Sequence, residues 1–152
     1  MKKKKLNKEA EDLVSLLDFE VISKRMENAS GWDKKRIALA EKEYRRFLYL
    51  IKIHPEEGLV PSEDVDEFWH YHILDTRKYA NDCQTLFGYF LHHNPNLAKG
   101  SEELEKLFKR TKELYRKSFQ NEVRRSAACM GDGASCAGRC YSETIIRYEG
   151  GL

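Results

Sequence analysis

This sequence has few prolines, no long apolar run and almost no excess of one charge. Each of these features excludes a class of protein. Only three prolines occur in 152 residues, and all lie between periodic segments, where they would end helices. No stretch approaches the roughly eighteen apolar residues of a membrane span, so we expect no membrane contact. Lysine and arginine number 27 against 25 acidic residues, so we expect no nucleic-acid binding, which favours a clear basic excess.

The first residues are basic and do not resemble a signal peptide. Four lysines, Lys2 to Lys5, are followed by charged residues instead of an apolar segment. We therefore expect a cytoplasmic protein, with residues 1–6 forming a basic disordered end. The cytosol keeps thiols reduced, so the four cysteines are not expected to form a disulfide scaffold.

Apolar residues recur at helical spacing along most of the chain. Alternation typical of a strand is confined to one short, isolated stretch, ETIIRY, near the end. The sequence therefore predicts an all-α fold, a single compact bundle of four or five helices over residues 7–125. A flexible tail that contains cysteine and glycine is predicted for residues 126–152. The residues expected to cap the starts of the helices are Asn7, Asp18, Asp33, Ser62 and Ser101.

One segment, DEFWHYHILDTRKYANDC, concentrates the side chains that could carry chemistry. On helices, Trp69, His72 and Tyr79 fall on one apolar face, which must point inward, and Cys83 extends it if the helix continues. We therefore predict that Trp69, Tyr79 and Cys83 are structural and that His72 is buried. Asp75 follows His72 by three residues and could hydrogen-bond its ring.

The same segment also contains a second histidine that points elsewhere. His70 lies about 160° around the helix from His72, so the two cannot bind one metal from the same side of a regular helix. A site would combine one of them with an aspartate and with a histidine of the later LHHNP stretch. Such ligands suit zinc or copper. The candidate ligands are His70, His72, His92, His93, Asp66 and Asp75.

Two other interpretations of these histidines stay open. A buried histidine beside an aspartate is often a structural hydrogen-bond pair that holds two helices in register. The same pair would suit a general base, although no serine or cysteine nucleophile is visibly partnered with it.

The tail carries three closely spaced cysteines, Cys129, Cys136 and Cys140. Their spacings, C-x₆-C and C-x₃-C, differ from the C-x₂-C pairs of zinc ribbons. Three thiolates with a fourth ligand could still hold zinc or copper(I). The alternatives are an unstructured end with exposed thiols, or a substrate for modification carried by the helical domain.

The stretch LVPSEDVDEFWHYHILDTRKYANDCQTLFGYFLHHNP resembles the core motif of the glycine-rich domain-containing protein-like family. The resemblance covers residues 43–95, and the chain is similar to the short bacterial members of that family. It implies a mostly helical fold and supplies no established activity. The matching residues are Val60, Pro61, Ser62, Asp66, Trp69, His70, His72, Leu74, Asp75, Thr76, Tyr79, Cys83, Phe87, Gly88, His92 and His93.

Three hypotheses for function follow. The first is a small cytosolic domain that binds metal through the histidine segment, the tail or both. The second is a non-catalytic interaction module whose helices present a surface to a protein partner. The third is a metal-dependent enzyme with an open coordination position among His70, His72, His92 and His93.

Overall fold

The periodic segments form six α-helices in the computed structural model, which describes residues 2–93 and 101–127. Those residues contain no strand, so the all-α prediction is confirmed, with one helix more than the four or five expected. The helices are α1 (Lys2–Leu16), α2 (Glu20–Ala29), α3 (Lys34–Ile53), α4 (Glu63–Leu74), α5 (Thr76–Phe87) and α6 (Glu102–Ala127).

The additional helix arises because Asp75 divides the histidine segment. Its backbone leaves the helical region, with φ −88° and ψ 74°, so α4 ends at Leu74. The Asp75 carboxylate then accepts a hydrogen bond from the backbone N–H of Lys78 at 3.4 Å and caps α5. A side chain that competes for backbone hydrogen bonds in this way favours a helix boundary.

Most helix starts agree with the predicted caps. Asp33, Ser62 and Ser101 each accept a hydrogen bond from the backbone N–H three residues later. The first helix differs, because α1 already begins at Lys2 instead of after Asn7. The described basic residues at the start therefore lie in a helix.

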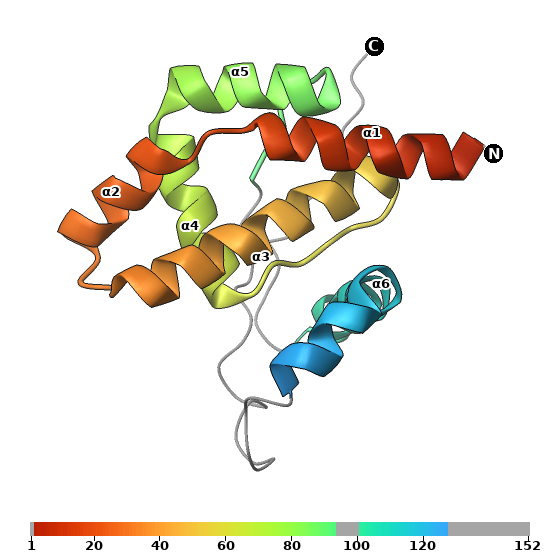
Figure 1. The fold of residues 1–152 in the computed structure, drawn as a ribbon. Helices are drawn as coiled ribbons and strands as arrows, with labels where there is room; N and C mark the ends of the chain where they lie inside the picture. Colours follow the sequence, from red (N-terminus) through yellow and green to blue (C-terminus); the bar gives the residue numbers. More distant parts are fainter. Residues whose placement is uncertain (1, 94–100, 128–152) are drawn as a thin grey trace.

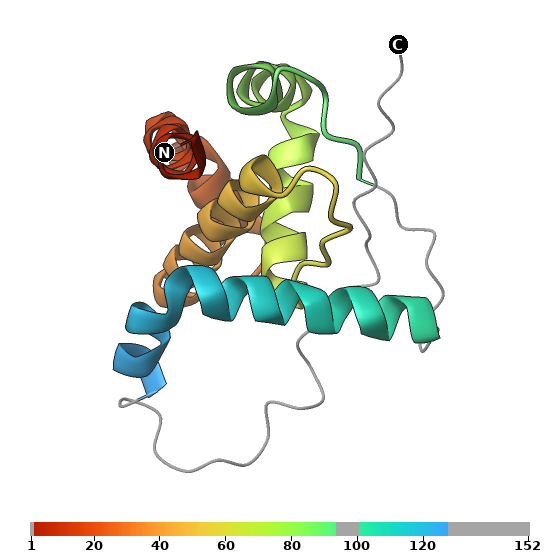
Figure 2. The ribbon, with the colours of Figure 1, turned by 90° about the vertical axis from the view of Figure 1, so that its right-hand side faces the viewer.

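Helix α3 is the centre of the arrangement. It packs against α1, α2 and α4, while α5 packs on α4 and α1. Figure 1 shows α3 running diagonally beneath α1, with α5 above. Figure 2 shows α6 crossing the opposite end of the molecule, below α3 and α4.

Several hydrogen bonds attach α6 to the rest of the protein, including those that the Arg110 guanidinium donates to the Glu57 carboxylate. The Tyr115 hydroxyl donates to the backbone carbonyl of Glu43 on α3 at 2.8 Å. The hydroxyl of Thr111 accepts from the backbone N–H of Val60 at 3.0 Å, in the connection between α3 and α4. Leu114, between them, is buried against the core. The last helix thus lies over the α3–α4 connection.

The core is formed from one apolar face of each amphipathic helix. Because the opposite faces are polar, no helix among the described residues is long and apolar enough to cross a membrane. The predicted inward face of α4 and α5 is confirmed, since it supplies much of the core. The largest fully buried side chains are Trp69, Tyr44, Tyr79, Phe19, Phe47 and Phe68.

Candidate metal centre

Helix α4 presents Asp66 and His70 on one face, because residues four apart lie one turn above each other. The Ser62 cap fixes the start of the helix, which places Asp66 in its first turn, where the helix dipole favours a negative charge. The Asp66 side chain is 10% exposed and that of His70 is 46% exposed. This face therefore leads from the protein interior to solvent.

The third member of the cluster, His93, comes from the chain after α5. That helix ends at Gly88, whose φ of +81° lies in the left-handed region that glycine favours. Leu91 is buried, and its carbonyl accepts a hydrogen bond from the Tyr79 hydroxyl at 2.5 Å. This anchor places the His93 ring edge-on against Trp69, with ring centroids 4.5 Å apart.

The Asp66 carboxylate lies near both imidazoles, whose ring centroids are 4.5 Å apart. Asp66 Oδ1 is 2.9 Å from His93 Nε2, and Asp66 Oδ2 is 3.7 Å from His70 Nε2. One potential ligand atom of each residue lies within 4.8 Å of the others. The structure therefore brings together three of the predicted candidates, from α4 and from the segment after α5, and we call Asp66, His70 and His93 the His/Asp cluster.

The donor set of the His/Asp cluster suits a transition metal. Imidazole nitrogen and carboxylate oxygen bind zinc at about 2.0–2.2 Å, which in a tetrahedral site places the ligand atoms about 3.3–3.6 Å apart. His70 is the least buried of the three, so its ring has room to close the remaining gap. Without an ion, the His93–Asp66 hydrogen bond already ties the segment after α5 to α4.

His72 belongs to a separate, buried network. It is 1% exposed, which confirms the predicted burial. Its Nδ1 lies 2.9 Å from the Tyr44 hydroxyl, and its Nε2 lies 2.9 Å from Asp82 Oδ2. The prediction that Asp75 holds this ring is therefore wrong. Because both ring nitrogens are hydrogen-bonded, the geometry supports a structural role for His72.

Burial and hydrogen bonding oppose each other in the electrostatics of this network. It lowers the pKa of His72, although the hydrogen bond to Asp82 opposes that shift. Burial alone would raise the pKa of Asp82, but the hydrogen bonds from His72 and Lys78 outweigh it, so the pKa of Asp82 is lowered. Lys78 Nζ lies 2.8 Å from Asp82 Oδ2, which completes the network.

Sequence reasoning did not find Asp82 or Tyr44 as partners of His72. One signal was the hydroxyl of Tyr44 in an apolar stripe, because a buried tyrosine usually needs a polar partner. Another was the spacing of Lys78 and Asp82, which are four apart on one helix face. The backbone break at Asp75 sets the direction of α5 and therefore which of its faces points toward His72. Helical periodicity alone does not predict that direction.

The lowered pKa of Asp82 predicts acid sensitivity. The carboxylate contributes stability above its unfolded pKa, about 3.9, and this contribution is lost as the pH falls through the lower folded value. We expect the free energy of unfolding, measured with urea between pH 6 and pH 3, to fall less steeply for Asp82→Asn than for the wild type. Lys78→Met removes one of the two hydrogen bonds to Asp82, so the steepness of its decline should lie between those of the other two proteins. Equal slopes for all three proteins would contradict the assignment.

The remaining predicted residues lie away from the His/Asp cluster. His92 is exposed beside Phe90, with ring centroids 4.9 Å apart. Asp75 sits at the helix break. Cys83 is 3% exposed, and burial raises the pKa of its thiol, which agrees with an inert core residue. The tail candidates lie outside the described residues, and their metal binding stays a prediction: Cys129, Cys136 and Cys140.

Comparison with known proteins finds a family and confirms the resemblance to glycine-rich domain-containing proteins. The UCP032817-like family matches residues 14–126, a range that includes the His/Asp cluster. Glycine-rich domain-containing protein 1 of Arabidopsis thaliana is 36% identical over 83 residues, which are 50% of this chain and 10% of that protein. Glycine-rich domain-containing protein 2 of Arabidopsis thaliana is 40% identical over 55 residues, 34% of this chain and 7% of that protein. The matched region is thus a small part of both relatives, and no solved structure matches the chain.

Proposed function

This chain belongs to the UCP032817-like family, and we propose that it binds a divalent transition-metal ion through Asp66, His70 and His93. One observation carries the proposal: the Nε2 atoms of two histidines from separate segments flank a single carboxylate, with the ligand atoms within 4.8 Å of one another. Asp66 is also 7% exposed, and a buried carboxylate is costly unless it is paired or coordinates a metal.

The spacing within the His/Asp cluster supports an ion over hydrogen bonds alone. The 3.7 Å between His70 Nε2 and Asp66 Oδ2 is longer than a hydrogen bond. An ion could be bound by both of these atoms, while the shorter contact to His93 keeps the carboxylate in place. Zinc accepts this mixture of nitrogen and oxygen ligands, and copper(II) is the second choice.

Three protein ligands leave one position of a tetrahedral zinc site open. Structural zinc sites use four protein ligands, whereas catalytic ones use three and hold water in the fourth position. The half-exposed His70 side chain lies on the solvent side of the His/Asp cluster, where a water or a substrate atom could enter. The alternative function, a non-catalytic interaction module, needs no ion, so metal binding separates the two.

The test is the zinc content of the untagged full chain after loading and gel filtration, measured by mass spectrometry. We expect the wild type to retain stoichiometric zinc. Asp66→Asn and His93→Ala should each weaken zinc binding, in competition with a chromophoric chelator, by at least about a hundredfold, because losing even an outer-shell partner costs about 10–100-fold.

The matched control is His92→Ala. This histidine neighbours His93 in sequence, is exposed and lies outside the His/Asp cluster, so the variant should bind zinc like the wild type. Circular dichroism checks that each variant is folded. If a Cys129→Ser/Cys136→Ser/Cys140→Ser variant loses the zinc while Asp66→Asn retains it, the ion belongs to the tail and the proposed site is wrong.

A further inference from the structure

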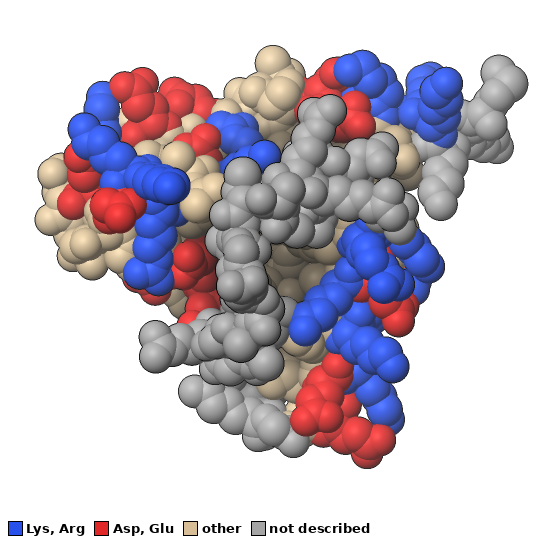
Figure 3. All heavy atoms as spheres, turned by 60° about the horizontal axis from the view of Figure 1, so that its bottom comes forward, with Lys and Arg blue, Asp and Glu red and all other residues tan. Residues whose placement is uncertain are grey.

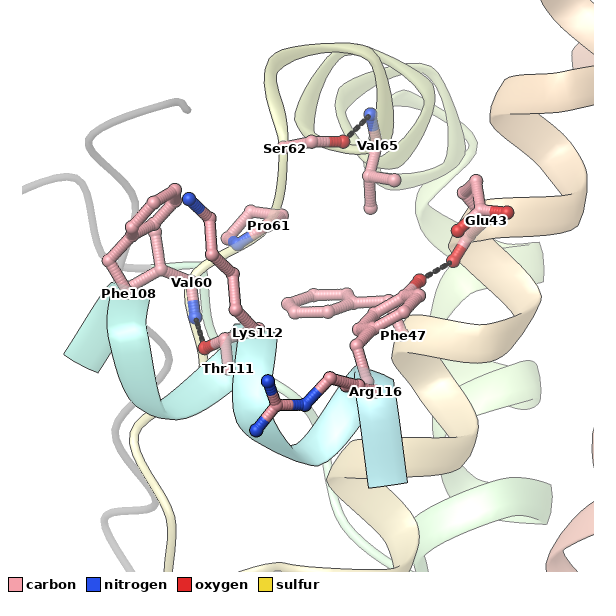
Figure 4. Close-up of a pocket in the computed structure, with 11 residues that line it drawn as sticks. Glu43, Phe47, Val60, Pro61, Ser62, Val65, Phe108, Thr111, Lys112 and Arg116 are labelled. Atoms are coloured by element: carbon pink, nitrogen blue, oxygen red, sulfur yellow. Dashed lines mark hydrogen bonds between the residues drawn. The ribbon is translucent and has the colours of Figure 1, made fainter. Parts of the chain in front are cut away.

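A cavity of about 340 Å³ lies between α3, the α3–α4 connection and α6. Figure 4 shows Phe47 of α3 on one side of it and Phe108 of α6 on the other. None of the residues of the His/Asp cluster lines it. Its size is at the lower end of the range for small-molecule sites, about 300–1,000 Å³. The apolar residues of its walls are Phe47, Val60, Pro61, Val65 and Phe108.

The polar groups in the walls are already engaged. The Thr111 hydroxyl accepts from the N–H of Val60 and donates to the carbonyl of Leu107. The Tyr115 hydroxyl donates to the carbonyl of Glu43, and burial raises its pKa, so it stays uncharged. An apolar body can therefore enter the cavity without leaving these polar groups unpaired.

Two basic residues and one acidic residue line the cavity. Lys112 and Arg116 lie one turn apart on α6, and both are exposed while lining the cavity. The lining carboxylate, Glu43, is paired with Arg46 at 2.6 Å. Figure 3 shows basic side chains, with acidic ones among them, beside an uncharged area on the face of the molecule near α6. The Lys112 ammonium lies 4.4 Å from the centroid of the Phe108 ring, and the exposed Arg116 lies beside the apolar walls.

We propose that this cavity binds a small molecule with an apolar body and one carboxylate head group. The apolar walls bury the body, and Arg116 holds the carboxylate with its planar guanidinium, a geometry that suits two parallel hydrogen bonds. Lys112, one turn earlier, adds a second positive charge. The inference goes beyond the proposed metal function, because it uses neither the His/Asp cluster nor an ion.

Head-group chemistry provides the first test. Decanoate, 1-decanol and decylammonium share one apolar chain and differ in charge, and each is titrated into the folded full chain by isothermal calorimetry. Decanoate should bind about tenfold more tightly than 1-decanol, since hydrogen bonds to a charged group are about twice as strong as neutral ones. Decylammonium should bind most weakly. Equal affinities for decanoate and 1-decanol would overturn the proposal.

A matched pair of variants provides the second test. Arg116→Gln should weaken decanoate binding about tenfold and leave 1-decanol unchanged. Lys109→Gln removes the same charge from the same helix, but Lys109 lies outside the cavity. The decanoate affinity of this variant should therefore stay within about twofold of the wild type. Asp66→Asn should bind decanoate normally, which keeps this result independent of the metal site.

Two results measured on the variants would overturn the proposal. The first is a decanoate affinity that Arg116→Gln does not change. The second is an increase in decanoate binding on Ile145→Ser/Ile146→Ser in the full chain, because that result would identify the end of the chain itself as the occupant of the cavity. A loss specific to Arg116→Gln, with neither of these results, supports the small carboxylate.

Discussion

Replacing Trp69 by alanine should lower the free energy of unfolding by about 3–5 kcal/mol, the usual cost of truncating a buried aromatic side chain. The ring is completely buried, and it packs edge-on against Phe47 at 5.9 Å and His93 at 4.5 Å between centroids. Its Nε1–H donates to the Tyr79 hydroxyl at 3.0 Å, so the substitution also removes a buried hydrogen bond. Urea unfolding followed by circular dichroism measures the loss.

Two further tryptophan variants make this expectation specific. Trp69→Phe keeps an aromatic ring in the core and removes the hydrogen bond to Tyr79, so it should cost about 1–2 kcal/mol. Trp32→Ala removes a partly buried ring whose polar contact is the Arg36 guanidinium 3.7 Å above it, and it should cost about 1 kcal/mol. A Trp69→Ala protein within about 1 kcal/mol of the wild type would mean that the ring does not support the core.

Trp69 also connects the fold to the His/Asp cluster. Its ring is one wall of the position that His93 occupies, and the same ring holds the Tyr79 hydroxyl that binds the carbonyl of Leu91. The segment after α5 is therefore positioned by core packing and not by the cluster alone. Preorganisation of this kind would lower the cost of the proposed metal binding.

The sequence was sufficient for the parts of the fold that depend on local pattern. The all-α class and the inward face with Trp69, His72 and Tyr79 follow from apolar spacing, and the structure confirms them. The caps at Asp33 and Ser62 follow from the chemistry of short polar side chains. These features are fixed by contacts within one turn of helix, so one sequence reveals them.

Features that depend on contacts between segments far apart in the sequence could not be predicted from local pattern. Asp75 was placed near the His72 ring by its spacing, but its own backbone conformation ends α4 and redirects α5. Asp82 then reaches the ring from a helix whose direction that turn sets. Asp66 and the LHHNP histidines were predicted as candidates, but the choice of His93 over His92 depends on the anchoring of Leu91.

Replacing His72 by alanine should destabilise the protein by about 3 kcal/mol, because it creates a cavity, orphans the buried Tyr44 hydroxyl and removes one of the two partners of Asp82. The ring lies among aromatic side chains, with the Phe19 centroid at 5.1 Å and the Tyr79 centroid at 4.9 Å. Its loss leaves the Tyr44 hydroxyl and the Asp82 carboxylate without their shared partner. The measurement is the free energy of unfolding from urea titrations at neutral pH.

A double-mutant cycle separates the hydrogen bond from the packing. His72→Phe refills the space but cannot accept from or donate to Tyr44, and Tyr44→Phe removes the hydroxyl from the other side. Because each single change orphans the same contact, the double variant should lose less stability than the sum of the two, by about 0.5–3 kcal/mol. Strict additivity would show that the Tyr44–His72 hydrogen bond contributes nothing, and that the imidazole is held by packing and by Asp82 instead.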